Sequence, residues 1–267
     1  MLDTLEALGE HRRSIVVIGA HAIYMQVAPT NVALAPFTSD TDLAIDPRGL
    51  ADELTLDDVM RSAGFTLDDD LEPGMWHRTL EGGTDEIDLM VPATMSGPGR
   101  RAARIPPHGD RVARKANGLE GVLVDNDVLD IPSLAPSRDA RTFRVRVAGP
   151  AALLVAKLFK LRERVSAGTP GRLFDKDAHD VYRLLIGCEA VDLRTRYLRL
   201  LTQDISRTVA NTAMNDLQAL FAAGPRAPGS AMAGRAEEGV GAPATVSLQA
   251  ALLAEELLKS LSPRHTQ

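Results

Sequence analysis

Two aspartates separated by a single residue border an apolar segment, and this pair constrains the chain more than any other feature. Asp40 and Asp42 precede Leu43-Ala44-Ile45, a short apolar run typical of a buried strand. Side chains at i and i+2 of a strand point to one face, so both carboxylates can share divalent cations, which prefer oxygen ligands. Because an unpaired buried charge is costly, we favour metal binding over the alternative of two surface carboxylates on an edge strand.

A glycine turn and a third carboxylate accompany the aspartate pair. Gly19-Ala20 follows the apolar run Val16-Val17-Ile18, and glycine there allows the backbone and the next helix to approach a phosphate. Asp88 lies in the apolar segment Glu86–Val91, which is predicted to form a hairpin with Trp76–Leu80. Three acidic side chains on adjacent strands beside a glycine turn indicate metal-assisted phosphoryl chemistry.

The rest of the pattern predicts a mixed α/β part followed by a helical part. Pro150 opens a helical stripe of leucines, since proline is permitted in the first turn of a helix. The expected strands are 13–18, 40–46, 76–80, 86–91, 121–124 and 142–147, and the expected helices are 20–27, 50–63, 150–164, 176–186 and 193–221. The expected domains are 1–148 (α/β), 149–222 (helical), 223–245 (a flexible linker rich in Gly, Ala and Pro) and 246–267 (an amphipathic helix).

In their order and spacing, these motifs resemble the nucleotidyltransferase fold of the DNA polymerase β superfamily. There, a Gly-Gly or Gly-Ser turn precedes an Asp-x-Asp strand, and a third Asp follows. The chain is most similar to AbiEii-like toxins, including the MenT toxins, because Pro150–Arg164 and Asp175–Leu185 also match. The resemblance covers roughly residues 12–190. It implies an α+β fold, with a mixed sheet and flanking helices followed by a helical C-terminal part that completes the active site.

The chain departs from the family pattern at two positions that concern triphosphate binding. The turn is Gly19-Ala20, so the serine that binds phosphate in relatives is missing. Pro36 stands two residues before Thr38, where family members often carry arginine. Both departures affect the expected mode of triphosphate binding more than the metal site.

The resemblance also implies roles for individual residues. The implied catalytic residues are Asp40, Asp42, Asp88, Lys157 and Asp177, and the three strand aspartates would hold two magnesium ions. The implied nucleotide-binding residues are Gly19, Ala20, Thr38, Ser39, Lys157 and Asp180. From the residues alone, Lys157 is equally a snorkelling lysine at the core margin, and Asp177 an ordinary carboxylate of a helix N-terminus. His21 and His179 are expected to be packed or hydrogen-bonded rather than metal ligands.

Charge and hydropathy limit the partners that we expect. The net charge of −6 argues against a general nucleic-acid coating protein, and no apolar run is long enough to span a bilayer, so a cytoplasmic protein is expected. One basic segment is either a solvated face or a surface for phosphates. Its members are Arg100, Arg101, Arg104, Arg111, Arg114 and Lys115.

The expected reaction is transfer of a nucleoside monophosphate from a nucleoside triphosphate (NTP) to a hydroxyl group. The family resemblance suggests tRNA as the acceptor and an antitoxin protein as a partner. A nucleotidyltransferase acting on a small molecule or a protein remains an alternative. A catalytically inactive nucleotide-binding module is a second alternative, although the presence of all three carboxylates argues against it.

Overall fold

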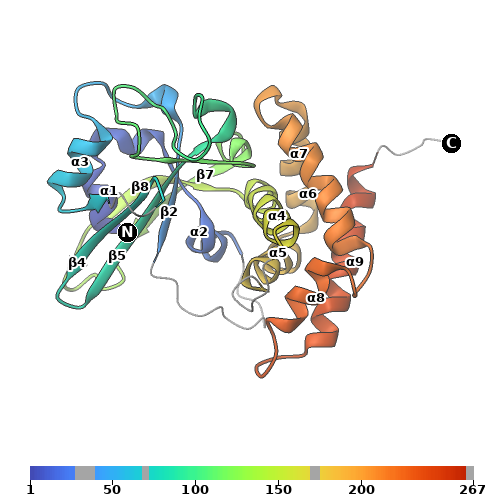
Figure 1. Ribbon diagram of the computed structural model, residues 1–267. Helices are drawn as coiled ribbons and strands as arrows, with labels where there is room; N and C mark the ends of the chain where they lie inside the picture. Colours follow the sequence, from blue (N-terminus) through green and yellow to red (C-terminus); the bar gives the residue numbers. More distant parts are fainter. Residues whose placement is uncertain (28–39, 68–71, 169–174, 263–267) are drawn as a thin grey trace. The chain divides into compact units, whose positions relative to one another are not determined.

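The computed structural model describes residues 1–27, 40–67, 72–168 and 175–262 (Figure 1). These residues form two compact units. The first contains the described residues of Met1–Ala22 and Thr38–Ala148, and the second contains those of Ile23–Phe37 and Gly149–Gln267. Helix α2 (Gly19–Gln26) begins in the first unit and ends in the second.

The first unit is built on a mixed sheet with eight strands among the described residues. Strands β1 and β8, β2 and β5, and β5 and β6 pair in parallel, and the other pairs are antiparallel. The spatial order is β3 (Thr66–Leu67), β4 (Met75–Leu80), β5 (Gly83–Pro92), β2 (Thr41–Ile45), β1 (Ile15–Val17), β8 (Thr142–Ala148) and β7 (Asn126–Pro132), and β6 (Arg114–Ala116) also pairs with β5.

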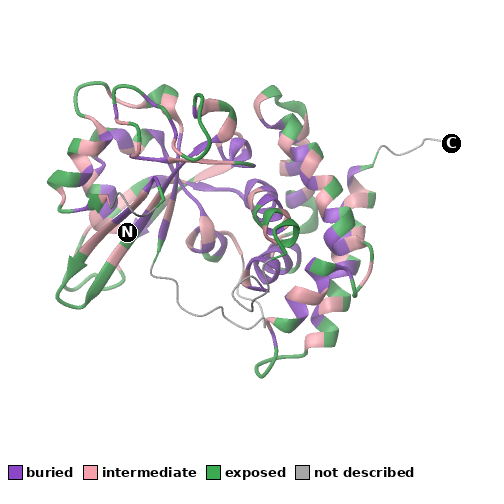
Figure 2. Cartoon of the chain, viewed as in Figure 1, coloured by how far each residue is buried: buried purple, intermediate pink, exposed green. Residues whose placement is uncertain are grey.

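The centre of this sheet is apolar because its strands are covered by other elements. All three residues of β1 are buried, as are four of the five residues of β2 (Figure 2). Helix α1 (Leu2–Ala7) contacts β8 and α3 (Leu56–Ser62), and Leu5 and Leu8 are fully buried. Gly64, at φ +82°, follows the end of α3, as a helix-terminating glycine does.

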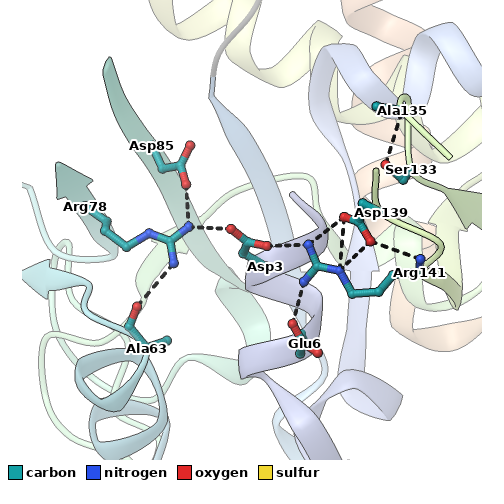
Figure 3. A network of polar contacts seen from close by, with 9 residues as sticks. All are labelled: Asp3, Glu6, Ala63, Arg78, Asp85, Ser133, Ala135, Asp139 and Arg141. Carbon is teal, nitrogen blue, oxygen red and sulfur yellow. Dashed lines mark hydrogen bonds and ion pairs between the residues drawn. The ribbon is translucent and has the colours of Figure 1, made fainter. Parts of the chain in front are cut away.

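Ion pairs join α1 to strands that lie far away in the sequence (Figure 3). Asp3 accepts hydrogen bonds from Arg78 of β4 at 3.0 Å and from Arg141 at 2.7 Å. Arg78 also binds Asp85 of β5 at 2.6 Å, and Arg141 also binds Asp139 at 2.7 Å. Arg78 and Arg141 therefore have a structural role, because they connect the N-terminal helix to the sheet.

The second unit is helical in its described part. Helix α4 begins with Pro150 at its first turn, and its leucine stripe is buried. The helices are α4 (Pro150–Ser166), α5 (Asp175–Gly187), α6 (Ala190–Thr202), α7 (Asp204–Leu217), α8 (Pro228–Arg235) and α9 (Pro243–Leu261), and a π-helical turn (Gln218–Ala222) follows α7. None of the helices in the described part of the chain is both long and apolar enough to cross a membrane.

Two elements differ from the sequence prediction, and a third follows one of its alternatives. The segment expected as a strand at 121–124 lies in a 3-10 turn (Glu120–Leu123), and the strand is β7, which pairs with β8 along its whole length. The helix over 193–221, for which a break is one of the expected alternatives, is interrupted at Gln203, whose backbone is extended. The predicted helix over 50–63 begins only at Leu56, where the Thr55 hydroxyl caps the amide of Asp58 at 3.1 Å.

Residues 223–245 are not the flexible linker that their composition predicts. They contain α8, where Ser230 is buried and donates a hydrogen bond to the Phe221 carbonyl at 3.0 Å. A Cβ atom on Gly229 would lie 2.6 Å from the Phe221 ring, and one on Gly234 would lie 2.1 Å from the Ser247 hydroxyl. The small residues therefore allow close helix packing, which composition alone does not distinguish from chain flexibility.

Candidate active site

The glycine turn lies directly against the second aspartate of the Asp-x-Asp motif. Gly19 has φ +71°, and a Cβ atom there would lie 1.9 Å from Oδ2 of Asp42. The amide of Ile18 donates to the Asp42 carbonyl at 3.0 Å, which fixes the turn to β2. Glycine is therefore required by both the backbone conformation and the space.

Asp42 and Asp88 lie side by side on neighbouring strands. They are direct partners in the parallel pairing of β2 with β5, whose strands run about 4.8 Å apart. Both are partly buried, and paired residues point to the same face of the sheet. Asp40 is exposed and immediately precedes β2. The structure thus brings together two of the three predicted strand carboxylates and the predicted glycine turn, whereas Asp40 lies outside the strand.

Arg114 is a site residue that the sequence did not single out by itself. It lies on β6, and its guanidinium binds both oxygens of Asp88 through three hydrogen bonds of 2.8, 2.9 and 2.6 Å. Burial acts to lower the pKa of Arg114, but Asp88, with Asp42 and Glu72, raises it on balance. Arg114 is therefore a fixed positive charge next to the aspartates.

His21 is a second neighbour of the aspartates. It lies in the first turn of α2, and burial lowers its pKa, with a contribution from the N-terminal amine, while Asp42 and Asp40 oppose the shift. The prediction that His21 is a packed or hydrogen-bonded histidine fits its hydrogen bond to the Asp40 backbone.

The carboxylates have the chemistry of a site for a divalent cation. Asp42 and Asp88 offer adjacent hard oxygen atoms, with Asp40 beside them in the sequence. Within the described ranges, however, no three His, Cys, Asp or Glu side chains are grouped closely enough to hold a metal. Arg114 already engages both oxygens of Asp88, so this carboxylate would have to exchange arginine for metal.

A second cluster, the Lys157 cluster, lies within the helical unit. It consists of Lys157, Arg164, Asp177, Asp180 and Arg183, on helices α4 and α5. The Lys157 amine, only 9% exposed, donates to Asp177 at 3.0 Å and to Asp180 at 2.7 Å. Three residues predicted to act together are thus in direct contact.

Further arginines surround the two carboxylates of the Lys157 cluster. Arg164 forms an ion pair with Asp177, and Arg183 pairs with Asp180 at 3.3 Å. Arg183 also lies 5.6 Å from the ring centroid of Tyr24. The Lys160 amine lies 3.9 Å from Asp177, so four cations approach two buried carboxylates, and Asp177 is more than an exposed residue of a helix N-terminus.

Comparison with family models matches residues 1–185 to a family described as nucleotidyltransferase. The chain belongs to this nucleotidyltransferase family. No curated protein and no solved structure matches the chain. The matched region contains both the Gly19–Asp42–Asp88 site and the Lys157 cluster. Membership supports nucleotidyl transfer and implies a nucleoside triphosphate substrate.

Some predicted residues of this nucleotidyltransferase lie outside its described part, namely Thr38, Ser39 and Pro36. Ala20 is buried and follows Gly19 in α2. His179 is hydrogen-bonded, because its Nε2 lies 2.5 Å from Glu237, and burial lowers its pKa. Asp175, which also begins α5, pairs with Arg235 at 2.8 Å.

The basic segment over residues 100–115 is not a uniform positive surface. Arg114 binds Asp88, Lys115 donates to the carbonyls of Gly97 and Gly99 at 2.9 and 3.0 Å, and Arg101 pairs with Glu72 at 2.8 Å. Arg100 and Arg104 are exposed. At least half of the charges that suggested a phosphate surface are therefore engaged by partners within the first unit.

Proposed function

We propose that this nucleotidyltransferase transfers a nucleoside monophosphate from an NTP to a hydroxyl group of tRNA, with two magnesium ions, and that it acts as a toxin-like protein controlled by an antitoxin. The observation that carries the catalytic part is the contact of Gly19 with Asp42, together with the pairing of Asp42 and Asp88. A phosphate-approaching turn and two adjacent carboxylates are the parts that this chemistry requires.

Each residue of the first unit has a proposed role. Asp40, Asp42 and Asp88 would hold the magnesium ions, which supply charge neutralisation and lower the pKa of an attacking hydroxyl. The backbone at Gly19 and Ala20, at the N-terminus of α2, would donate to a phosphate oxygen of the substrate. Asp88 is a candidate to accept the hydroxyl proton once Arg114 no longer engages both of its oxygens.

The Lys157 cluster is proposed to bind the triphosphate. The Lys157 amine is held between Asp177 and Asp180, so it can approach a phosphate only by exchanging one of these partners. Arg164 and Arg183 remain on the two carboxylates when this exchange occurs. The cations that pair with Asp177 and Asp180 outnumber these two carboxylates, and the excess positive charge favours an anionic ligand. Asp177 is the alternative acceptor of the hydroxyl proton.

The tRNA acceptor and the antitoxin partner rest on the resemblance to AbiEii-like toxins. The test is incubation of the pure protein with magnesium, each of the four α-labelled NTPs and total tRNA, followed by separation of RNA, protein and small molecules. We expect label in the RNA fraction. Label attached only to protein, or only to a new small-molecule product, would contradict tRNA as the acceptor but would still support nucleotidyl transfer.

A further inference from the structure

A basic pocket lies at one end of the sheet in the first unit, away from the residues discussed so far. It has a volume of about 380 Å³, and four of its lining side chains are arginines. Two of them lie on η1 (Gly9–Ser14), the 3-10 helix before β1, and two lie on β8. The charged side chains that line it are Arg12, Arg13, Arg144, Arg146 and a single acid, Glu10.

The arginines of this pocket are oriented by their neighbours. Arg12 lies 4.6 Å from the ring centroid of Phe143, and Arg146 donates a hydrogen bond to the carbonyl of Arg13. Arg13 pairs with Glu10 at 2.8 Å, but both side chains are more than 70% exposed, so this ion pair contributes little to stability.

Acidic side chains near the pocket offset part of its charge. Asp130 is the cross-strand partner of Arg144. Burial raises the pKa of Asp46, but the hydrogen bonds of Arg48 and, to a smaller extent, the charge of Arg146 lower it on balance. Four arginines beside one lining acid still form a local positive site on a chain of net charge −6. Such a site is suited to an anion with repeated charges.

The sheet register relates the pocket to the aspartates. Arg146 pairs with Val16, and Val16 pairs with Ala44, which is two residues after Asp42 on the same strand face. Arg144 alternates with Arg146 and shares that face. Arg146 is therefore two strand spacings, or roughly 10 Å, from Ala44. Val16 and Ala44 are fully buried, so the register gives the spacing between the pocket and β2 but no open path along this face.

We propose that this pocket binds the sugar-phosphate backbone of the RNA acceptor, an inference that rests on the proposed function. Guanidinium groups bind phosphates in bidentate fashion, and Arg144 and Arg146 lie roughly 6.6 Å apart along β8, which suits successive charges rather than one. The pocket thus replaces residues 100–115 as the principal RNA-binding surface.

The test compares two double variants that each remove two exposed arginines. Arg13→Gln with Arg144→Gln changes the pocket, and Arg100→Gln with Arg104→Gln is the matched control. Binding of total tRNA is titrated at several salt concentrations, and binding of an NTP is measured in parallel. The pocket variant should bind tRNA roughly tenfold or more weakly and flatten the salt slope by about 2, while the control keeps the wild-type slope.

Three results would overturn the proposal. The first is an unchanged salt slope in a pocket variant whose melting temperature is that of the wild type. The second is a loss of tRNA affinity in the control variant alone. The third is a pocket variant that loses NTP binding but keeps tRNA binding. Label transfer is scored separately. If the wild type binds tRNA through the pocket but does not label it, the proposed function is contradicted and the RNA-binding role of the pocket is not. If the pocket variant labels tRNA as well as the wild type does, the RNA-binding role of the pocket is contradicted.

Discussion

At the residue scale, the contact between Gly19 and Asp42 is the most sensitive point of the site. Gly19→Ala places a methyl group 1.9 Å from the Asp42 carboxylate and adds the strain of φ +71°. Gly9→Ala is the matched control, because Gly9 has φ +47° with nothing within 4 Å of a Cβ atom. Denaturant unfolding should show a cost of about 1–2 kcal/mol for Gly9→Ala and a larger cost for Gly19→Ala. Equal costs would contradict the close contact.

Arg114 supports the aspartates when no metal is bound. Arg114→Gln removes the guanidinium that binds both oxygens of Asp88 and leaves two adjacent carboxylates with less counter-charge. We expect a loss of about 1–3 kcal/mol in the presence of a chelator. Magnesium should then raise the melting temperature of the variant more than that of the wild type, since the cation replaces the missing charge. Equal magnesium shifts would contradict this role of Arg114.

The parts of the site that the sequence predicted are those that follow from strand alternation. Asp42, Asp88 and Gly19 could be placed because buried strands and a glycine turn have short, regular signals. Arg114 could not be assigned a role, because it reaches Asp88 from a three-residue strand 26 positions later. Its position in a basic segment was the only signal, and that signal indicated a surface.

At the element scale, the Lys157 cluster joins α4 to α5. Lys157→Met leaves Asp177 and Asp180 buried with less compensating charge, and we expect a loss of about 3–5 kcal/mol. Lys160→Met is the control, since Lys160 is 47% exposed and 3.9 Å from Asp177, and should cost less than about 1 kcal/mol. The readout is denaturant unfolding of both variants.

A second variant separates the packing role of Lys157 from ligand binding. Adding Asp180→Asn to Lys157→Met removes one of the two buried carboxylates that lost the lysine amine and should recover part of the lost stability. NTP binding should remain weak in the double variant, because the amine is still missing. Recovery of both stability and NTP binding would assign Lys157 a structural role alone.

Helices and strands were predicted well where hydrophobic periodicity is strong, and poorly where contacts with distant segments determine the secondary structure. The leucine stripe of α4 and the hairpin of β4 with β5 have clear periods. Strand β7 is an edge strand whose polar and apolar residues follow no regular alternation, and it gains its structure from pairing with β8. Helix α8 depends on glycine contacts with Phe221 and Ser247, which no local pattern reveals.

At the scale of the whole molecule, three histidines make stability depend on pH. Burial lowers the pKa of His21, His108 and His179 from 6.5 in the folded protein. Below about pH 6.5 the unfolded chain therefore binds more protons, so stability is fully present above this pH and falls as pH decreases toward the folded pKa values. Asp216, whose pKa burial raises from 3.8, acts in the opposite direction at lower pH.

The melting temperature should therefore decrease between pH 7 and pH 5.5. His179→Gln provides the control, because glutamine can still donate to Glu237 but does not titrate. The decrease should be smaller in this variant. A melting temperature that stays constant or rises over this range in the wild type would contradict the assignment of neutral, buried histidines.

The central claim is that the aspartates beside Gly19 transfer a nucleotidyl group from an NTP. The most direct measurement compares α-labelled with γ-labelled NTP, in magnesium and total tRNA, for wild type and Asp42→Asn. The wild type should transfer the α label to the acceptor and release the γ label as pyrophosphate, and Asp42→Asn should do neither while keeping its fold. Transfer of the γ label, or undiminished α-label transfer by Asp42→Asn, would contradict the account.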